Sequence, residues 1–336
     1  MNNASSPTVS VVMPTYNRAE LLPRTIESIL SQDFEDFELL IVDDGSTDDT
    51  AAVIREIQAQ DARLRYLPLP ENRGIGFARQ AGLQHASGKY IALADSDDLW
   101  LPGKLKVQVE VLERYPEIDI LFGDFWNIDY VRGTEYGGFA HTQAGMRHLT
   151  VRQLAADLWL IEKGVETGML ISNFIAAPTM VLKADIFTKV GGFDITLSTS
   201  VDREFGWRAA VLGARYAYLS RPLIKRYRYP SSVTAHTCEA TMRMLQALET
   251  CRRTCEAARR PDLLGHVRAS EDRAWRKLIR ACGEKGQRRQ ACQAYVKSLR
   301  RGFSLRTLAF LIMALGGRPL ITLALKLRTR LPCTAR

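Results

Sequence analysis

Several features that mark other classes of protein are absent from this sequence of 336 residues. Its first residues show no basic start followed by an apolar core, which a signal peptide would have. No run of about 18 or more uncharged apolar residues is present, so we expect no membrane-spanning helix. All six cysteines lie beyond residue 237 and form no C-x-x-C pair, which favours buried, reduced thiols over a zinc site or disulfides. These absences predict a cytoplasmic protein.

Acidic residues are scarce in the last third of the chain. From His236 to Arg336 there are 22 Lys and Arg against 7 Asp and Glu, whereas the first 235 residues carry 24 against 30. The sequence therefore predicts a flexible start over residues 1–7, a mildly acidic body over 8–235 and a basic helical region over 236–336. A basic region favours anionic partners. Nucleic acid is disfavoured because the basic residues are not interleaved with aromatic side chains on which bases stack.

Apolar strands and amphipathic helices alternate over the first hundred residues. Runs of apolar residues predict strands at Val9–Met13, Glu38–Val42, Arg63–Pro70 and Tyr90–Ala94. Between them, residues 19–32, 46–60 and 74–87 have the spacing of helices. This alternation predicts βαβ units and a parallel sheet of the α/β class. Ligands bind beyond the carboxyl ends of such strands, so the polar residues that follow the strands are candidates for one shared site.

The fourth predicted strand ends in a cluster of carboxylates. Asp95, Asp97 and Asp98 follow a run that is apolar on both faces, which indicates a central strand with a sheltered end. A solvated turn with a helix cap would need one acid rather than three. Like charges are tolerable at a sheltered edge when a divalent cation neutralises them, and oxygen ligands favour Mg²⁺ or Mn²⁺. Such a metal usually shares its ligands with a substrate phosphate, so we expect a nucleoside diphosphate held through the metal.

Three further side chains are candidates for binding that ligand. Asp44, after the second strand, could accept hydrogen bonds from a base or a ribose, although it also suits an ordinary strand-to-helix turn. Tyr16 could stack on the base. Arg79 could reach the diphosphate, and the alternative is an arginine on a helix surface. The residues by themselves leave these alternatives open.

Five motifs occur in order along the chain: VSVVMPTYNR, LLIVDDGSTDDT, ENRGIGFARQAG, GKYIALADSDD, and GGFD before VDREFGWR. Together they resemble the inverting glycosyltransferases of family 2, from about Thr8 to Arg208. The resemblance implies a GT-A fold, which is Rossmann-like, with a mainly parallel central sheet flanked by helices, here with a C-terminal α-helical extension. It also implies a nucleotide-binding half over residues 8–120 and an acceptor half over 121–235.

The resemblance implies which residues bind the donor and the metal. The family holds the nucleotide base at the positions of Pro14, Thr15, Tyr16 and Asp44. The run Asp95–Ser96–Asp97 matches the DxD motif, whose first acid contacts ribose or sugar. The later acids, Asp97 and Asp98, would hold Mn²⁺ or Mg²⁺.

The resemblance also implies the catalytic base. Asp202 matches the acid that takes the proton of the acceptor hydroxyl. Alternatively, Asp202 is an acid that the helix dipole favours at a helix N-terminus, and a catalytic acid can occupy that position too. Two positions depart from the family's pattern: Val201 stands where Glu is usual, and Gln80 where Asn is usual. Neither departure removes a catalytic group.

The implied activity is metal-dependent transfer, with inversion, of a hexosyl or N-acetylhexosaminyl group from a nucleotide sugar. We expect a UDP-sugar donor and a hydroxyl of a glycan or lipid-linked acceptor, in cell-surface polysaccharide or lipopolysaccharide synthesis. One alternative is a sugar-nucleotide pyrophosphorylase, but PTYNRAELL replaces the Gly-rich basic loop that this class has after its first strand. Another is a non-catalytic sugar-nucleotide or glycan-binding protein, which the intact Asp95, Asp97 and Asp202 disfavour.

The basic C-terminal region has two interpretations. Leu-rich segments between cations, over residues 300–332, suit packed helices with solvated cations. They suit equally an interfacial anchor, with an apolar face toward acyl chains and cations toward anionic headgroups. The second interpretation predicts peripheral contact with the cytoplasmic face of a membrane.

Overall fold

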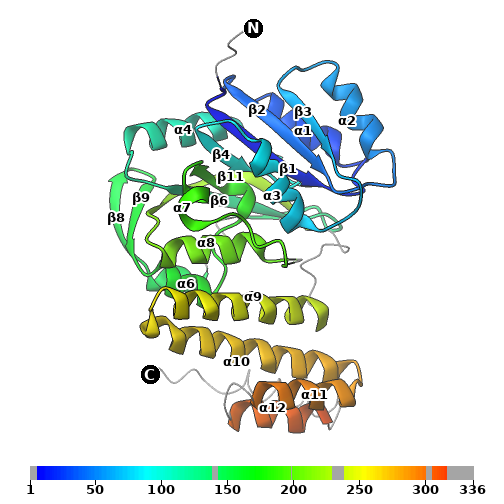
Figure 1. Ribbon diagram of the computed structural model, residues 1–336, viewed down its shortest axis with the longest axis vertical. Coiled ribbons are helices and arrows are strands. Elements are labelled where there is room, and N and C mark those ends of the chain that lie inside the picture. Colours follow the sequence, from blue (N-terminus) through cyan, green and yellow to red (C-terminus); the bar gives the residue numbers. More distant parts are fainter. Residues whose placement is uncertain (1–5, 138–142, 198, 229–237, 300–304, 316–336) are drawn as a thin grey trace. The chain divides into compact units, whose positions relative to one another are not determined.

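The computed structural model describes residues 6–137, 143–197, 199–228, 238–299 and 305–315. The chain forms two compact units, Met1–Ser232 and Val233–Arg336 (Figure 1). The predicted boundary at residues 235 and 236 lies outside the described residues, as do the first five residues of the predicted flexible start.

The first unit is built on one mixed sheet, in which eleven strands are described. Its N-terminal part is parallel and has the order β3-β2-β1-β4. These strands are β1 (Val9–Thr15), β2 (Phe37–Asp43), β3 (Leu64–Pro68) and β4 (Tyr90–Leu93). Every residue of β1, β2 and β4 is buried, as expected of strands that are covered on both faces. The α/β class predicted from the alternation is confirmed.

The other half of the sheet mixes parallel and antiparallel pairs. Its strands are β5 (Leu99–Trp100), β6 (Ile120–Asp129), β7 (Thr134–Tyr136), β8 (Thr150–Ala155), β9 (Leu158–Lys163), β10 (Val181–Lys183) and β11 (Tyr216–Arg228). β10 is antiparallel to both β4 and β6, and β11 is parallel to β6. Because β4 and β6 flank the same antiparallel strand, they point the same way. The carboxyl ends of β1, β4 and β6 therefore lie at one edge of the sheet.

Helices cover both faces of this sheet (Figure 1). The described α-helices of the unit are α1 (Leu22–Leu30), α2 (Thr50–Gln58), α3 (Ile75–His85), α4 (Lys104–Arg114), α6 (Val165–Ile171), α7 (Ile186–Val190) and α8 (Val201–Val211). Ile26 of α1 and Leu105 of α4 join a core with Val11. Gly82 of α3 lies instead against Val12. Neighbouring residues of a strand point to opposite faces, so α3 covers the face opposite α1 and α4.

The second unit is helical over its described residues. Its helices are α9 (Cys238–Ala257), α10 (Pro261–Glu284), α11 (Arg288–Leu299) and α12 (Leu305–Leu315). They share a small core that includes Leu278, Ile279, Cys282, Ala291 and Ala314. Among the described residues, no disulfide joins the cysteines and no helix is long and apolar enough to cross a membrane. The predicted C-terminal helical extension is confirmed over this range.

Candidate active site

Arg79 brings together two carboxylates from distant parts of the chain. Its Nη2 donates to Oδ1 of Asp95 at 2.7 Å, and its Nη1 lies 3.8 Å from Oδ1 of Asp202. Asp95 follows β4, Asp202 lies in the first turn of α8, and Arg79 belongs to α3. The Arg79 side chain is only 3% exposed. The predicted donor-side acid and the predicted catalytic base therefore share one buried cation.

The turn after β2 closes over the start of α3. The two carboxylate oxygens of Asp44 accept backbone hydrogen bonds, from Arg73 N–H at 2.9 Å and from Gly74 N–H at 2.7 Å. Gly45 has a φ of +74°, and a Cβ there would come within 2.7 Å of the Glu71 backbone, so this turn requires glycine. Burial raises the pKa of Asp44, and the two N–H groups oppose that rise. Asp44 thus holds the β3–α3 loop at the carboxyl edge of the sheet.

The turn after β1 is bound to the segment that precedes α2. Asn17 has a φ of +50°, and its side-chain oxygen accepts the Thr47 N–H at 2.8 Å. Tyr16 is 41% exposed, whereas Pro14 and Thr15 are buried in β1. An exposed aromatic ring on a turn fixed in this way offers a face on which a base can stack.

The three carboxylates after β4 differ in exposure. The Asp95 side chain is 25% exposed, Asp97 is half-buried and Asp98 is 2% exposed. Burial, reinforced by the Asp95 charge, raises the pKa of Asp97. Burial, reinforced by the charges of Asp95 and Asp97, raises the pKa of Asp98 well above its usual range. Oδ1 of Asp98 accepts the Tyr227 N–H from β11 at 3.2 Å, and its Oδ2 has no hydrogen-bond partner among the described residues.

Asp97 and Asp98 fit a divalent cation. A buried carboxylate oxygen without a partner is rare in folded proteins, and a cation would satisfy it and offset the neighbouring charges. Two carboxylates are enough for Mg²⁺ or Mn²⁺ when substrate phosphates and water supply the remaining ligands. Among the described side chains, no three His, Cys, Asp or Glu residues already form a metal cluster. The metal ion stays a prediction, and the side chains of Asp97 and Asp98 are suited to binding it.

Glu204 and Arg208 anchor the loop that precedes α8. Glu204 is buried, and its two carboxylate oxygens accept hydrogen bonds from Arg208 at 2.8 and 3.0 Å. Arg208 also donates to the carbonyl oxygens of Val190, Gly191 and Gly192. The sequence interpretation missed this pair, although opposite charges four residues apart on a helix are its signal. The pair keeps the GGFD segment against the helix that carries Asp202.

Gln80 binds the same segment from α3. Its side-chain oxygen accepts the Phe193 N–H at 2.8 Å. A Cβ on Gly192 would come within 2.1 Å of that oxygen, so the two residues are in close contact. Gln80, which stands where the family usually has Asn, therefore links α3 to the segment that Arg208 holds.

Unsatisfied polar atoms collect at this edge of the sheet. Four of the described buried side-chain atoms that lack a hydrogen-bond partner belong to it: Thr15 Oγ1, Arg79 Nε, Asp98 Oδ2 and Asn127 Nδ2. Buried polar groups are nearly always paired, so an edge with several unpaired ones is suited to a polar ligand. The sequence interpretation missed Asn127, which lies near the carboxyl end of β6. A polar residue inside the buried strand ILFGDFWNID is the signal that would have found it.

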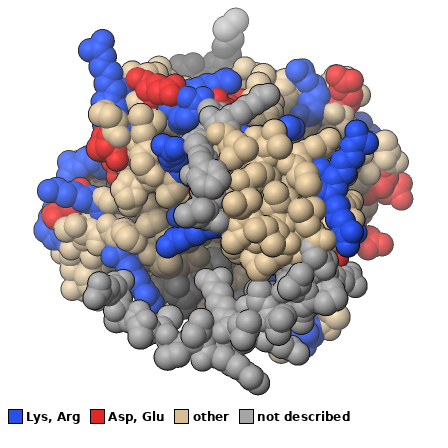
Figure 2. Space-filling model, turned by 90° about the horizontal axis from the view of Figure 1, so that it is seen from below, with Lys and Arg blue, Asp and Glu red and all other residues tan. Residues whose placement is uncertain are grey.

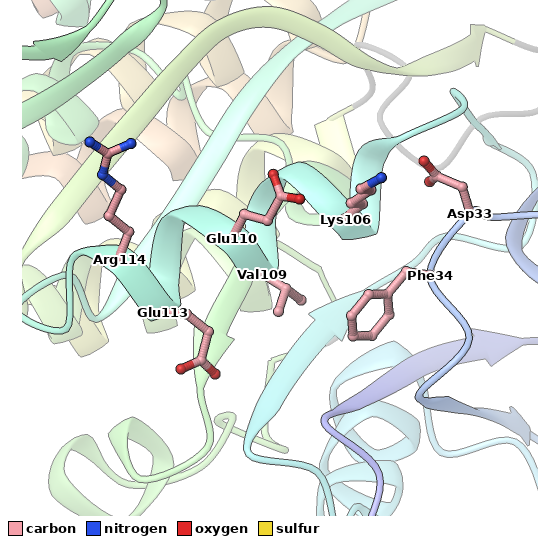
Figure 3. Close-up of a pocket in the computed structure, with 7 residues that line it drawn as sticks. All are labelled: Asp33, Phe34, Lys106, Val109, Glu110, Glu113 and Arg114. Carbon is pink, nitrogen blue, oxygen red and sulfur yellow. The ribbon is translucent and has the colours of Figure 1, made fainter.

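A separate hollow of about 580 Å³ lies in the first unit (Figure 3). It is lined by residues of α4 and of the α1–β2 connection: Asp33, Phe34, Lys106, Val109, Glu110, Glu113 and Arg114. Its lining mixes apolar groups with charges of both signs and contains none of the predicted site residues. The hollow is therefore distinct from the carboxylate edge.

Comparisons with known proteins place the chain in a family. Residues 10–157 match the model of glycosyl transferase family 2. A glycosyltransferase of Methanocaldococcus jannaschii is 31% identical over 227 residues, which cover 67% of this chain and 72% of that protein. The chain belongs to glycosyl transferase family 2, and the resemblance inferred from the motifs is confirmed.

Two further comparisons concern a named activity and the fold. A UDP-Glc:alpha-D-GlcNAc-diphosphoundecaprenol beta-1,3-glucosyltransferase of Escherichia coli is 35% identical over 117 residues, 35% of this chain and 45% of that protein. The mannosyltransferase of Pyrobaculum calidifontis, solved with GDP-Man and Mn²⁺, has a TM-score of 0.57 at 18% identity, covering 96% of this chain and 84% of that one. This likeness confirms the GT-A fold. The chain spans only 17% and 42% of the first two curated relatives that it matches.

Proposed function

We propose that this protein is an inverting glycosyltransferase that uses a nucleotide-sugar donor. The observation that carries the proposal is the Arg79 network, which sets Asp95 and Asp202 side by side at the carboxyl edge of the sheet. Sugar transfer needs a donor-binding acid and a base for the acceptor at adjacent positions. Membership in glycosyl transferase family 2 supports the same reaction.

The donor is proposed to lie along the carboxyl ends of β1, β2 and β4. Its base would stack on the exposed ring of Tyr16, next to Pro14 and Thr15, with Asp44 close by. Hydroxyl groups of its ribose or sugar would donate hydrogen bonds to the Asp95 carboxylate. A UDP-sugar is the donor we favour, because the Escherichia coli relative is named for UDP-Glc.

The proposed reaction needs one proton transfer and one displacement. Asp202 takes the proton of an acceptor hydroxyl, and the hydroxyl oxygen attacks the anomeric carbon of the donor. A new carbon–oxygen bond forms while the bond from the anomeric carbon to the diphosphate breaks, so the configuration inverts and a nucleoside diphosphate leaves. Arg79, in contact with Asp202, keeps the carboxylate oriented for this step.

Asp97 and Asp98 are proposed to hold Mn²⁺ or Mg²⁺. The cation would supply counter-charge for the leaving diphosphate. The unpartnered Oδ2 of Asp98 supports this assignment. Chelation with EDTA should therefore abolish turnover, and added Mn²⁺ should restore it.

The acceptor is proposed to be a hydroxyl of a glycan or of a lipid-linked sugar. The Escherichia coli relative is named for a sugar carried on diphosphoundecaprenol, which supports an acceptor of that kind and a role in cell-surface polysaccharide synthesis. Such an acceptor would place the protein at the cytoplasmic face of a membrane. A hexosyl or N-acetylhexosaminyl group is the transferred unit we favour.

The test compares the full chain with its Asp202→Asn variant. Release of nucleoside diphosphate from UDP-Glc, UDP-GlcNAc and GDP-Man is measured with Mn²⁺ present. Loss of the base should lower turnover about 10²- to 10⁴-fold, while donor affinity stays within about threefold. Asp185→Asn is the matched control, because the Asp185 side chain is 56% exposed at the N-cap of α7, where it pairs with Lys189. Unchanged turnover in Asp202→Asn would refute the assignment of the base.

Measurements of pyrophosphate release and of nucleotide-sugar binding separate the alternative functions. A pyrophosphorylase would release pyrophosphate from a nucleoside triphosphate and a sugar phosphate. A non-catalytic binding protein would bind a nucleotide sugar, but neither the full chain nor the Asp202→Asn variant would turn it over.

A further inference from the structure

The helix α12 has one buried face and one exposed apolar face. Thr307 and Ala314 are 1% and 0% exposed, and the Thr307 hydroxyl donates to Asp272 of α10 at 2.5 Å. Away from this buried stripe, Ile312 and Leu315 are 61% and 38% exposed. A helix that buries one stripe needs no apolar residues outside it, so this exposed apolar face is suited to an apolar partner.

The neighbouring helix α11 is exposed in a similar way. Val296 and Leu299 are 61% and 41% exposed. Arg289 lies seven residues before Val296, so the two share one face of α11, and Lys297, next to Val296 in the sequence, is exposed as well. We call the exposed residues of the two helices, Arg289, Val296, Lys297, Leu299, Arg306, Ile312 and Leu315, the α11–α12 surface.

The cations around this surface lack the ion pairs that the preceding helices have. In α10, Arg276 pairs with Asp272 and Arg280 pairs with Glu284. By contrast, exposed cations from residue 285 onward have no carboxylate within 4.0 Å among the described residues: Lys285, Arg288, Arg289, Lys297 and Arg306. The sequence contains no acidic residue after Glu284. This end of the helical unit therefore keeps an uncompensated positive charge.

The space-filling view from below shows Lys and Arg side chains beside a broad area without charge (Figure 2). We propose that the α11–α12 surface binds anionic phospholipid bilayers, with its aliphatic side chains among the acyl chains and its cations at the headgroups. The purpose of this binding rests on the proposed function, because it would bring the enzyme to a lipid-linked acceptor. The binding itself depends on no step of the reaction.

The chemistry of the surface favours a bilayer over other partners. Its exposed large apolar residues are all aliphatic, whereas single-stranded nucleic acid is bound through stacking aromatics. Tyr295 and Phe310, the aromatic residues of these two helices, pack against the helical core. A second copy of the same surface would bring the uncompensated cations together, which like charges oppose.

Co-sedimentation of the full chain with vesicles tests the proposal without donor or acceptor. Vesicles of phosphatidylcholine are compared with vesicles that contain about one third phosphatidylglycerol. We expect binding to the anionic vesicles only, weakened by added salt. Ile312→Glu and Lys297→Glu should each lower the partition coefficient on the order of tenfold. The matched control is Met242→Glu, which places the same charge at a 51% exposed position on α9 and should change binding less than about twofold.

Other outcomes would overturn the proposal. Equal binding to both vesicle types, or unchanged binding by Ile312→Glu, would show that the surface does not bind anionic bilayers. Retention of the chain on poly(U) but not on vesicles would identify nucleic acid as the partner. A dimer in sedimentation that Ile312→Glu dissociates, with no binding to vesicles, would identify a second copy as the partner. Donor hydrolysis separates this proposal from the proposed function. Ile312→Glu should weaken vesicle binding and keep hydrolysis, whereas Asp202→Asn should lower hydrolysis and keep vesicle binding.

Discussion

Among single residues, Arg79 links the two acids of the proposed site. Its guanidinium contacts Asp95 and Asp202, which are more than one hundred residues apart in the sequence. The sequence interpretation assigned Arg79 to a diphosphate, and that contact stays a prediction. The observed ion pairs give the same residue a positioning role, because they bring the two acids to one point and balance their charges.

Removing the Arg79 cation should damage both stability and activity. Arg79→Met would leave two carboxylates close together without a counter-charge, so we expect a loss of about 3 kcal/mol in the free energy of unfolding. Turnover of the nucleotide sugar should fall about a hundredfold, since Asp202 loses the contact that orients it. Thermal unfolding and donor hydrolysis measure the two effects. Arg79→Lys keeps the charge and should recover part of both, and an Arg79→Met variant with full turnover would contradict the positioning role.

A second residue of interest, Lys104 of α4, is buried and has no carboxylate partner among the residues that the structure describes. It is 1% exposed, its Nζ donates to Gln108 at 2.8 Å, and it lies 3.8 Å from the centre of the Trp100 ring. Burial lowers the pKa of Lys104 to about 7. The charged form is therefore costly in the folded chain.

Lys104→Met should stabilise the first unit more at pH 6 than at pH 9. An unfolded lysine keeps its proton up to about pH 10.4, whereas the folded Lys104 loses it near pH 7. Between these values the unfolded state binds more protons, so the stability of the parent rises with pH and the advantage of the variant shrinks. Thermal unfolding at both pH values measures this difference. An equal gain at pH 6 and pH 9 would show that Lys104 keeps an ordinary pKa.

Among the elements, α3 is held unusually close to the sheet. A Cβ at Gly82 would lie 2.5 Å from Val12 Cγ1 and 3.0 Å from Val42 Cγ2. Glycine at this position lets the helix approach β1 and β2. Arg79 precedes Gly82 by almost one turn, so the distance between helix and sheet also sets the position of its guanidinium.

Gly82→Ala should push α3 away from the sheet. We expect the free energy of unfolding to fall by about 1–3 kcal/mol, with lower turnover because Arg79 moves with the helix. The control is Gly265→Ala in α10, where nothing lies within 4 Å of an added Cβ. That substitution should raise stability by about 0.5–1 kcal/mol through helix propensity. Urea unfolding of both variants makes the comparison, and a stabilised Gly82→Ala variant would disprove the close packing.

In the molecule as a whole, the proposed chemistry and the proposed membrane contact belong to different units. All the predicted site residues lie in Met1–Ser232, which has its own large core. The α11–α12 surface lies in Val233–Arg336, which has a separate core. Units with independent cores are expected to fold separately.

A chain that ends at Ser232 should therefore fold and hydrolyse the donor, while losing its affinity for anionic vesicles. Circular dichroism, donor hydrolysis and vesicle co-sedimentation measure these three properties. If the shortened chain sediments with vesicles as the full chain does, the α11–α12 surface is not the membrane contact. If it folds but fails to hydrolyse the donor, the second unit contributes to catalysis.

Several features of the protein were determined by the sequence alone. The alternation of apolar runs and helical spacing predicted β1 to β4, because strand and helix periods are local properties of the chain. The order of the motifs predicted the family and the GT-A fold, both of which the comparisons confirm. Asp44, Asp95, Asp97 and Asp98 follow strands, so their position at one edge of the sheet could be expected before any coordinates.

The tertiary structure decided the pairing of these groups. The antiparallel strand β10 enters the sheet between β4 and β6, and no local pattern specifies that neighbour. Asp98 is covered by the backbone of Tyr227, and Arg79 reaches Asp202, through contacts between residues more than one hundred positions apart. Sequence periodicity reports only on neighbours within a few residues, whereas burial and ion pairing depend on which distant segments pack together.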